Sequence, residues 1–407
     1  GITSASIATI LKQSGFKVSM LKIDPYLNVD PGTMSPLEHG EVFVTADGAE
    51  TDLDLGNYER FIDKTLTKKN SFTTGQVYQS VIKREREGGY LGKTIQVIPH
   101  VVDEIKERIY AATEDNDFLI IELGGTVGDI EGLPFMEAIR SIRHELPKTN
   151  TMNIHLSLVP YIKAAGELKT KPTQHSVQEL RRIGITPHML VCRTERELPK
   201  ALKDKLALAC DIDRNAVIEA GDAQSIYQVP LQFIKEGILT PLSEHFNIKI
   251  KPNMEKWDTL VKNILLPQGE VTIAFVGKYL DLKESYKSLI EALIHAGAHL
   301  STKVNIHWCD SERIEDVGAY DIIGNSDAIL VAGGFGQRGV NGKLAAIKYA
   351  RENKIPYLGI CLGMQLAIIE FAKNVLGLED ANSIEFDPNT KNPLIYLIDE
   401  FIDQSGN

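Results

Sequence analysis

The sequence predicts an α/β protein with two domains, each a mainly parallel sheet covered by helices. Apolar, strand-like runs alternate with amphipathic helical segments over residues 1–240, and the alternation restarts at residue 270. Such alternation is typical of parallel strands joined by crossover helices, which cover both faces of the sheet. With 407 residues, the chain is also longer than a domain with a single hydrophobic core normally is, so two or three domains are expected.

The first domain, 1–240, opens with a helix rich in small residues that ends near Gly15 and leads into a strand. Because a doubly wound domain normally begins with a strand, we expect a leading strand and loop to precede Gly1. In chain order, the expected strands are 17–24, 118–125, 153–161, 188–193 and 216–221. Helical periodicity predicts helices over 92–112 and 134–146.

Residues 241–269 contain prolines and one amphipathic helix but few strand signals, so we assign them as a linker. The second domain, 270–407, then has its own series of elements. Strands are expected over 271–279, 303–310, 327–334 and 356–360, with helices over 285–298 and 342–353.

Composition excludes several function classes. A net charge of −11 argues against binding to a nucleic acid polymer, which favours basic surfaces. No apolar run reaches the length of a membrane span, so no membrane partner is expected. The four cysteines lie far apart without metal-site or disulfide spacing, which fits a reducing cytoplasm.

The stretch "PYLGICLGMQ", 356–365, places Cys361 on a Gly-flanked turn between an apolar strand and a helix. Such a turn exposes a nucleophile, and the helix N-terminus favours a thiolate and directs N–H groups toward an oxyanion. The Gly-rich run 331–339 could supply another N–H donor. No histidine follows His307, although a nucleophilic cysteine normally needs one as base. Cys361 is therefore either an inert core thiol or part of a site that is incomplete in this chain.

The first domain carries carboxylates suited to a metal. Glu50, Asp52 and Asp54 are expected in an acidic loop. Glu122 ends a buried strand, where an α/β enzyme places metal-binding carboxylates. Mg²⁺ needs few protein carboxylates when phosphate oxygens complete its shell, so Asp54 with Glu122 would suffice. The alternative reading of the acidic loop is a solvated surface.

The first domain also carries donors for phosphates. The segment 166–184 holds a compact donor set suited to a triphosphate or a base edge, formed by Lys169, Thr170, Lys171, Thr173 and Gln174. Here too the alternative is a solvated basic loop. A helix that opens on Gly1, with Thr3 and Ser4, could follow a phosphate-cradling loop.

Two motifs and three long stretches together resemble known families. "GICLGMQ" and "GGFGQRG" resemble the class I glutamine amidotransferases. The stretches 21–61, 124–135 and 166–176 resemble the CTP synthase family, and this resemblance runs from Gly1 to Asn407. It implies a P-loop-like synthetase domain followed by a class I glutamine amidotransferase domain. This chain would then stop short of the phosphate loop at one end and of a late His and Glu at the other.

The resemblance implies specific site residues. Cys361 would attack glutamine, whose other contacts would be Gly334, Leu362, Gly363, Met364, Gln365 and Glu385. ATP would contact Gly1, Ile2, Lys22, Asp54, Gly221, Asp222 and Ala223, with Mg²⁺ on Asp54 and Glu122. UTP, or the product CTP, would contact Asp129, Ile130, Glu131, Lys169, Thr170, Lys171, Pro172, Thr173, Gln174 and Lys205. An internal ammonia channel would be lined by Pro36, His39 and Val42.

The implied reaction belongs to pyrimidine nucleotide biosynthesis. ATP phosphorylates the 4-oxygen of UTP, and ammonia from glutamine displaces that phosphate to give CTP. The resemblance also implies GTP as allosteric activator, CTP as feedback inhibitor, a homotetramer and a cytoplasmic location. Two alternatives stay open: another ATP-dependent glutamine amidotransferase of the cobyrinate amidase type, and a nonenzymatic nucleotide-binding paralogue.

Overall fold

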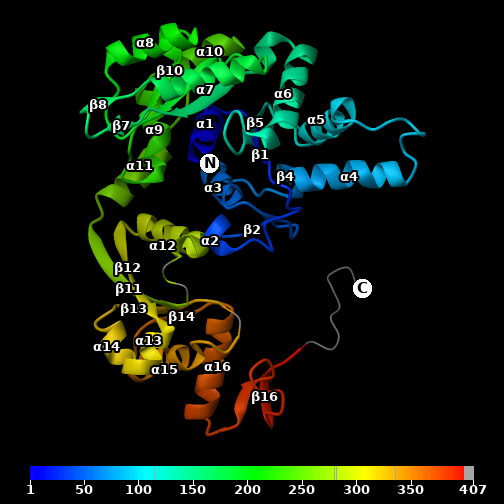
Figure 1. The fold of residues 1–407 in the computed structure, drawn as a ribbon. Helices are drawn as coiled ribbons and strands as arrows, with labels where there is room; N and C mark the ends of the chain where they lie inside the picture. Colours follow the sequence, from blue (N-terminus) through cyan, green and yellow to red (C-terminus); the bar gives the residue numbers. More distant parts are fainter. Residues whose placement is uncertain (114, 279, 281, 335, 398–407) are drawn as a thin grey trace. The chain divides into compact units, whose positions relative to one another are not determined.

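The computed structural model describes residues 1–113, 115–278, 280, 282–334 and 336–397 of the chain. Two compact units make up the chain, Gly1–Leu265 and Leu266–Asn407 (Figure 1). The division falls inside the predicted linker 241–269. In that segment, α10 (Leu239–Phe246) and α11 (Glu255–Leu265) belong to the first unit. Both units contain parallel sheets with helices, which confirms the predicted α/β class.

The first unit contains two three-stranded parallel sheets. One has the order β4 (Ser71–Thr73), β1 (Val18–Asp24), β5 (Phe118–Leu123). The other has the order β10 (Val217–Ala220), β9 (Met189–Arg193), β6 (Ile154–Leu158). Every residue of β1 is buried, as expected of a central parallel strand covered on both faces.

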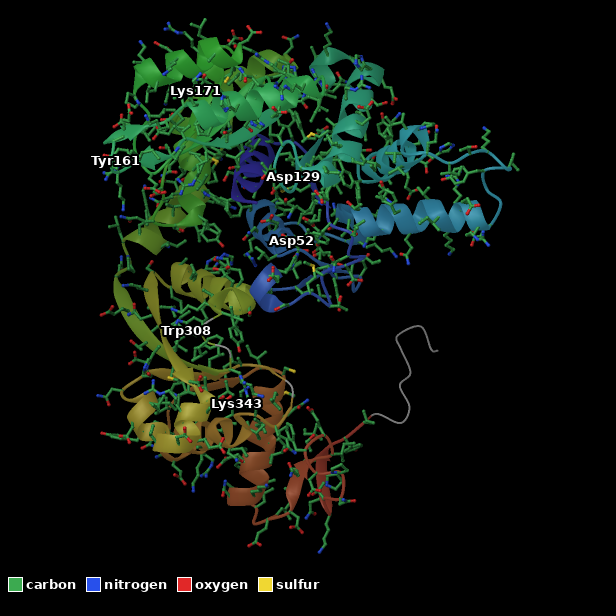
Figure 2. The ribbon with its side chains drawn as sticks, in the orientation of Figure 1. Asp52, Asp129, Tyr161, Lys171, Trp308 and Lys343 are labelled. Atoms are coloured by element: carbon green, nitrogen blue, oxygen red, sulfur yellow. The ribbon has the colours of Figure 1, made fainter. Side chains whose placement is uncertain are left out.

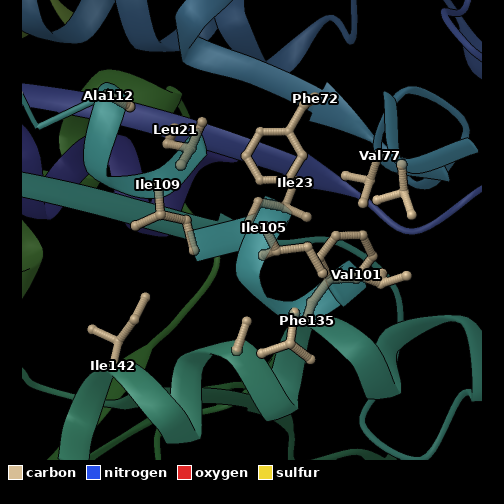
Figure 3. Packing of buried hydrophobic residues seen from close by; sticks show 13 residues of the cluster. Leu21, Ile23, Phe72, Val77, Val101, Ile105, Ile109, Ala112, Phe135 and Ile142 are labelled. Carbon is tan, nitrogen blue, oxygen red and sulfur yellow. The ribbon is translucent and has the colours of Figure 1, made fainter. Parts of the chain in front are cut away.

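Helices surround these sheets. They are α1 (Ile2–Gln13), α2 (Pro36–His39), α3 (Asp54–Ile62), α4 (Thr74–Arg86), α5 (Val102–Ala111), α6 (Leu133–Glu145), α7 (Lys171–Arg182), α8 (Lys200–Cys210) and α9 (Val229–Lys235). A cluster of buried side chains joins β1 and β4 to α4, α5 and α6, as Figure 3 shows for Leu21, Phe72, Val77, Ile105 and Phe135. This apolar core fixes the carboxyl ends of β1 and β5, where the polar side chains lie.

Two predictions about local structure in this unit were wrong. The helix predicted over 92–112 runs regularly only from Val102, because Pro99 has no N–H and Ile98 has extended dihedral angles. The acidic segment is a loop only at Asp52: Glu50 lies in β3 (Glu50–Thr51), which pairs antiparallel with β2 (Phe43–Val44), and Asp54 begins α3. A second hairpin joins β7 (Tyr161–Ile162) and β8 (Glu167–Leu168).

The second unit contains one four-stranded parallel sheet with a core on each face. Its order is β12 (Thr302–Asp310), β11 (Gly269–Gly277), β13 (Ala328–Val331), β14 (Tyr357–Gly359). Its helices are α12 (Lys287–His299), α13 (Ser311–Val317), α14 (Ala319–Ile323), α15 (Val340–Glu352) and α16 (Leu362–Asn374). Strands β15 (Ala381–Ser383) and β16 (Asn392–Ile395) form a separate parallel pair. Along β11, Ala274 and Val276 face one core and Phe275 the other.

Among the described residues, no helix combines the length and the apolar character that crossing a bilayer requires.

Candidate active sites

Cys361 sits on a strained turn between β14 and α16. Its backbone has φ 54° and ψ −112°, a conformation that residues other than glycine rarely adopt, and its side chain is exposed. It is the N-cap of α16. Strain of this kind at an exposed thiol is typical of a nucleophile elbow.

The glycines that flank Cys361 make this turn possible. A Cβ added to Gly359 would lie 2.5 Å from the Gly363 carbonyl carbon. One added to Gly363 would lie 2.1 Å from the Val331 O. The two glycines therefore let α16 approach β13 and β14 closely, which holds Cys361 at the carboxyl end of the sheet.

Two further backbone segments border the thiol. A Cβ built on Gly333 would lie 3.3 Å from the Cys361 Cβ and 3.9 Å from its Sγ, so the Gly-rich loop passes directly beside the side chain. The Gly336 N–H donates to Glu385 Oε1 at 3.2 Å, which ties this loop to the segment expected to bind glutamine. Glu385 therefore lies beside the loop that contains Gly334.

The start of α16 offers a donor to an oxyanion. The Gly363 N–H donates to the Ile360 O and the Gln365 N–H to the Cys361 O. Within the described part of the chain, the Leu362 N–H has no protein acceptor. Leu362 and Gly363 are buried, whereas the Met364 side chain is half exposed.

The histidines of this unit, His295, His299 and His307, lie on α12 and β12. His307 is on β12, at the opposite edge from β14, and its Nδ1 is 3.4 Å from Ser326 Oγ. His295 lies within α12. This agrees with the sequence-based decision not to assign either one as the base of Cys361.

In the first unit, Lys22 joins three carboxylates at the carboxyl end of β1. Its Nζ lies 3.1 Å from Asp24 Oδ1, 3.1 Å from Asp52 Oδ1 and 2.9 Å from Asp54 Oδ2. Burial opposes the charge of Lys22, but these carboxylates outweigh burial and raise its pKa. Burial raises the pKa of Asp24 to about 6, against the influence of Lys22.

Asp54 and Glu122 converge on the start of α1. The Gly1 nitrogen contacts Glu122 Oε1 and lies 3.5 Å from Asp54 Oδ2. Tyr58, completely buried on α3, donates to Glu122 Oε2 at 2.7 Å. Burial acts to raise the pKa of Asp54, whereas Lys22 acts to lower it. The carboxylates of Asp54 and Glu122, which meet at the start of α1, are oxygen ligands of the kind that Mg²⁺ prefers.

The expected ammonia-channel residues lie near this cluster in the chain. Pro36 and His39 are the ends of α2, and Val42 precedes β2. His39 Nε2 lies 3.3 Å from Asp52 Oδ2 and 3.5 Å from the Tyr26 hydroxyl.

The expected pyrimidine-nucleotide residues divide into exposed and internal groups. Lys169 forms an ion pair with Glu167, and Lys205 of α8 also lowers the pKa of that carboxyl, so the two lysines share one neighbourhood. Lys171 and Pro172 are exposed at the start of α7, and Figure 2 labels Lys171.

The internal group does not form the open donor set that the sequence suggested. Thr173 is completely buried and donates to the Leu158 O at 3.2 Å, and Gln174 Nε2 donates to Thr170 Oγ1 at 3.1 Å. Thr173 therefore joins α7 to β6, whereas Gln174 and Thr170 bond to each other at the start of α7.

The remaining nucleotide residues lie at strand ends. Asp129 Oδ2 accepts from the Thr126 N–H at 2.8 Å, and Ile130 and Glu131 are exposed in a short helix (Ile130–Gly132) after β5. Gly221, Asp222 and Ala223 follow β10, where Asp222 Oδ1 pairs with Arg193 Nη2 at 2.5 Å. All are therefore at carboxyl ends of parallel strands, the usual side for ligands.

Sequence reasoning missed four residues that contact these sites. Asp24 ends the predicted strand 17–24, and a carboxylate at the end of a buried strand is the same sequence signal that singled out Glu122. Tyr58 lies one helical turn after Asp54, which the loop assignment concealed. Lys278 and Lys343, described below, hold the Gly-rich loop and carry no sequence signal of their own.

Comparison with known proteins agrees with this geometry. The family model described as "CTP synthase N-terminus" matches residues 1–248, and the one described as "Glutamine amidotransferase class-I" matches residues 281–393. The CTP synthase of Nautilia profundicola is 70% identical over 100% of this chain and 75% of its own length.

The chain belongs to the CTP synthase family. It is accordingly a glutamine-hydrolysing ligase, with a synthetase and a glutamine amidotransferase segment in one chain. The CTP synthases of Wolinella succinogenes and Campylobacter jejuni are 69% and 67% identical over 100% of this chain and 74% and 75% of their own lengths. These matches decide against a cobyrinate amidase type and against a nonenzymatic paralogue.

Proposed function

We propose that Cys361 is the nucleophile of glutamine hydrolysis. The strained, exposed turn at Cys361 carries this proposal. The loop at Gly333 borders the same thiol, and so does the Leu362 N–H, which has no acceptor among the described residues. The thiolate attacks the amide carbon of glutamine, and ammonia leaves as the thioester forms. The developing oxyanion is then within reach of backbone donors. Gly334, Gly363, Met364, Gln365 and Glu385 surround the glutamine.

The first unit uses ATP to activate UTP. The 4-oxygen of UTP attacks the γ-phosphorus of ATP and ADP leaves. Ammonia then adds at C4, and the phosphate departs with the former 4-oxygen to give CTP. Phosphoryl transfer depends on positioning and charge neutralisation, which suits the group of Lys22, Asp54 and Glu122.

Mg²⁺ would be held by Asp54 and Glu122, where it would neutralise phosphate charge. Support comes from the convergence of the two carboxylates at the start of α1. Lys22 adds a fixed positive charge beside Asp54. The remaining ATP contacts proposed are Gly1, Ile2, Gly221, Asp222 and Ala223.

UTP and its product CTP would share one site. Lys169 and Lys205 supply positive charge around Glu167, which supports their assignment to a triphosphate. The other contacts proposed are Asp129, Ile130, Glu131, Thr170, Lys171, Pro172, Thr173 and Gln174.

Regulation and assembly complete the proposal on the basis of family membership. GTP would act as allosteric activator, CTP as feedback inhibitor, and the enzyme would be a homotetramer. Pro36, His39 and Val42 would line the route of ammonia. A cytoplasmic location is supported by the free state of all four cysteines.

One experiment separates the two half-reactions. The full-length enzyme is supplied with UTP, ATP and Mg²⁺, with either glutamine or ammonium as nitrogen source, and CTP is measured. We expect Cys361→Ala to abolish glutamine-dependent synthesis and to spare ammonium-dependent synthesis. Loss of both would make Cys361 structural, and retention of both would remove it from the reaction. Failure to form CTP from UTP with either source would refute the proposed reaction.

A further inference from the structure

Two buried lysines hold the backbone of the Gly-rich loop. Lys343 of α15 is completely buried, and its Nζ donates to the Ala332 O at 2.8 Å and to the Gly333 O at 3.2 Å. Figure 2 labels this residue. Lys278, just after β11, is also buried and donates to the Gly336 O at 3.2 Å. Lysine is almost never fully buried without a charged partner, so a specific role for Lys343 is expected.

The acceptors of Lys343 are carbonyls and not carboxylates. Among the described residues, no carboxylate forms an ion pair with it, so its charge is not cancelled locally. Burial, together with the nearby Lys278, lowers the pKa of Lys343 to about 8, whereas Cys361 acts in the opposite direction. A buried ammonium of this kind gains most when an anion forms beside it.

Lys343 and Cys361 both lie beside the Gly333–Gly334 backbone. A Cβ built on Gly333 would be 3.9 Å from Cys361 Sγ, and one built on Gly334 would be 3.5 Å from Lys343 Nζ. Lys278, which donates to the same loop, has Arg338, Glu312 and Glu385 as charged neighbours. Of these, Glu385 already accepts from the Gly336 N–H.

The direction of the two carbonyls fixes the direction of the following N–H groups. In a trans peptide, the C=O of one residue and the N–H of the next point in opposite directions. Because Lys343 binds the carbonyls of Ala332 and Gly333, the N–H groups of Gly333 and Gly334 point away from it. Those N–H groups are the donors that an oxyanion at Cys361 needs.

We propose that Lys343 is a positioning residue for glutamine hydrolysis, which orients the Gly333 and Gly334 N–H groups toward the oxyanion and keeps positive charge beside the Cys361 thiol. The inference rests on the proposed role of Cys361. Lys343 does not touch glutamine. It acts through the loop backbone and through its charge, which favours a thiolate.

The test uses Lys343→Met and Lys343→Gln in the full-length enzyme. For each, we measure kcat and KM for glutamine, ammonium-dependent CTP synthesis, and the rate of Cys361 alkylation by iodoacetamide at neutral pH. Lys343→Met should lower kcat roughly 100-fold, the cost of losing an oxyanion donor, with little change in KM. Its alkylation should also slow, and ammonium-dependent synthesis should be unchanged. Lys343→Gln still donates to a carbonyl but is neutral, so kcat should recover in part while alkylation stays slow.

The matched control is Lys348→Met, on the same helix, whose side chain is half exposed and lies 4.0 Å from Glu352. It should behave as the unaltered enzyme. Normal kcat and normal alkylation in Lys343→Gln would overturn the proposal, even where Lys343→Met does not fold in a thermal unfolding assay. Cys361→Ala distinguishes an error in the proposed nucleophile from an error in the proposed role of Lys343. If it keeps glutamine-dependent synthesis, the proposed nucleophile is wrong; if it loses that activity while the Lys343 variants are normal, only the role of Lys343 is wrong.

Discussion

Lys22 of β1 and Glu122 of β5 are direct partners in the parallel pairing of the two strands. Residues level with each other on adjacent strands project to the same face, so a cation and a carboxylate reach the same end of the sheet. Asp24, two residues after Lys22, projects to that face as well. The core beneath is apolar, and the polar cluster therefore depends on its own internal charge balance.

Removing the cation from this cluster should destabilise the first unit. In Lys22→Met, the carboxylates of Asp24, Asp52 and Asp54 lose their shared partner at 2.9–3.1 Å. Leaving buried charges uncompensated costs about 3 kcal/mol of unfolding free energy, measured by urea denaturation. CTP synthesis from ammonium should also be lost. The control is Lys17→Met, exposed just before the same strand, and an equal loss in both variants would contradict the argument.

Apart from β4 (Ser71–Thr73), the order along the chain of the strands in the three main parallel sheets and the position of the thiol were predictable from the sequence. Buried parallel strands appear in a sequence as apolar runs. A Gly-flanked cysteine between an apolar strand and a helix is typical of a strand-to-helix turn that exposes a nucleophile. The expected convergence of Asp54 and Glu122 also appears in the structure.

Long-range partners were less predictable. Lys343 is far from Cys361 in sequence, and a lysine within a helix normally indicates a solvated surface. Thr170, Thr173 and Gln174 looked like open donors, but burial gave each an internal partner. Side-chain burial depends on packing between distant segments, which periodicity alone does not reveal.

The Tyr58 hydroxyl should strengthen Mg²⁺ binding at the proposed site. It donates to Glu122 Oε2 at 2.7 Å, so Tyr58→Phe leaves that oxygen without this donor. Loss of such a supporting hydrogen bond weakens metal binding by roughly 10-fold or more. We expect the Mg²⁺ concentration for half-maximal ammonium-dependent synthesis to rise accordingly, with glutamine hydrolysis unchanged. An unaltered Mg²⁺ dependence would argue against Glu122 as a ligand.

Gly359 should be essential to the packing of the nucleophile turn. In Gly359→Ala, the new Cβ would lie 2.5 Å from the Gly363 carbonyl carbon, so α16 must move away from β14. Overpacking of this kind costs about 2 kcal/mol, observable as a lower melting temperature, and should impair glutamine hydrolysis. Gly269→Ala is the matched control, since a Cβ there meets nothing within 4 Å. Equal melting temperatures in both variants would count against the close approach.

His188 should make the first unit sensitive to acid. Burial, aided by His245 and Arg143, lowers the pKa of His188 to about 4 from an ordinary value of 6.5. The unfolded chain therefore takes up a proton before the folded one, and stability falls as pH drops from about 6.5 to about 4. In His188→Gln this part of the fall should disappear, measured as unfolding free energy against pH. Parallel curves for the two proteins would show that folding does not lower the pKa of His188.

Thiol reactivity should single out Cys361 among the four cysteines. Burial raises the pKa of Cys192 and of Cys309 to about 12 and raises that of Cys210 as well, so their thiolates are scarce. Cys361 alone is exposed. A glutamine-mimicking electrophile should therefore modify Cys361 in the native enzyme, as read by peptide mass spectrometry, and all four cysteines after unfolding in urea. Equal modification of all four cysteines in the native state would mean that thiol reactivity does not follow exposure. It would also argue against activation of the Cys361 thiol by its turn.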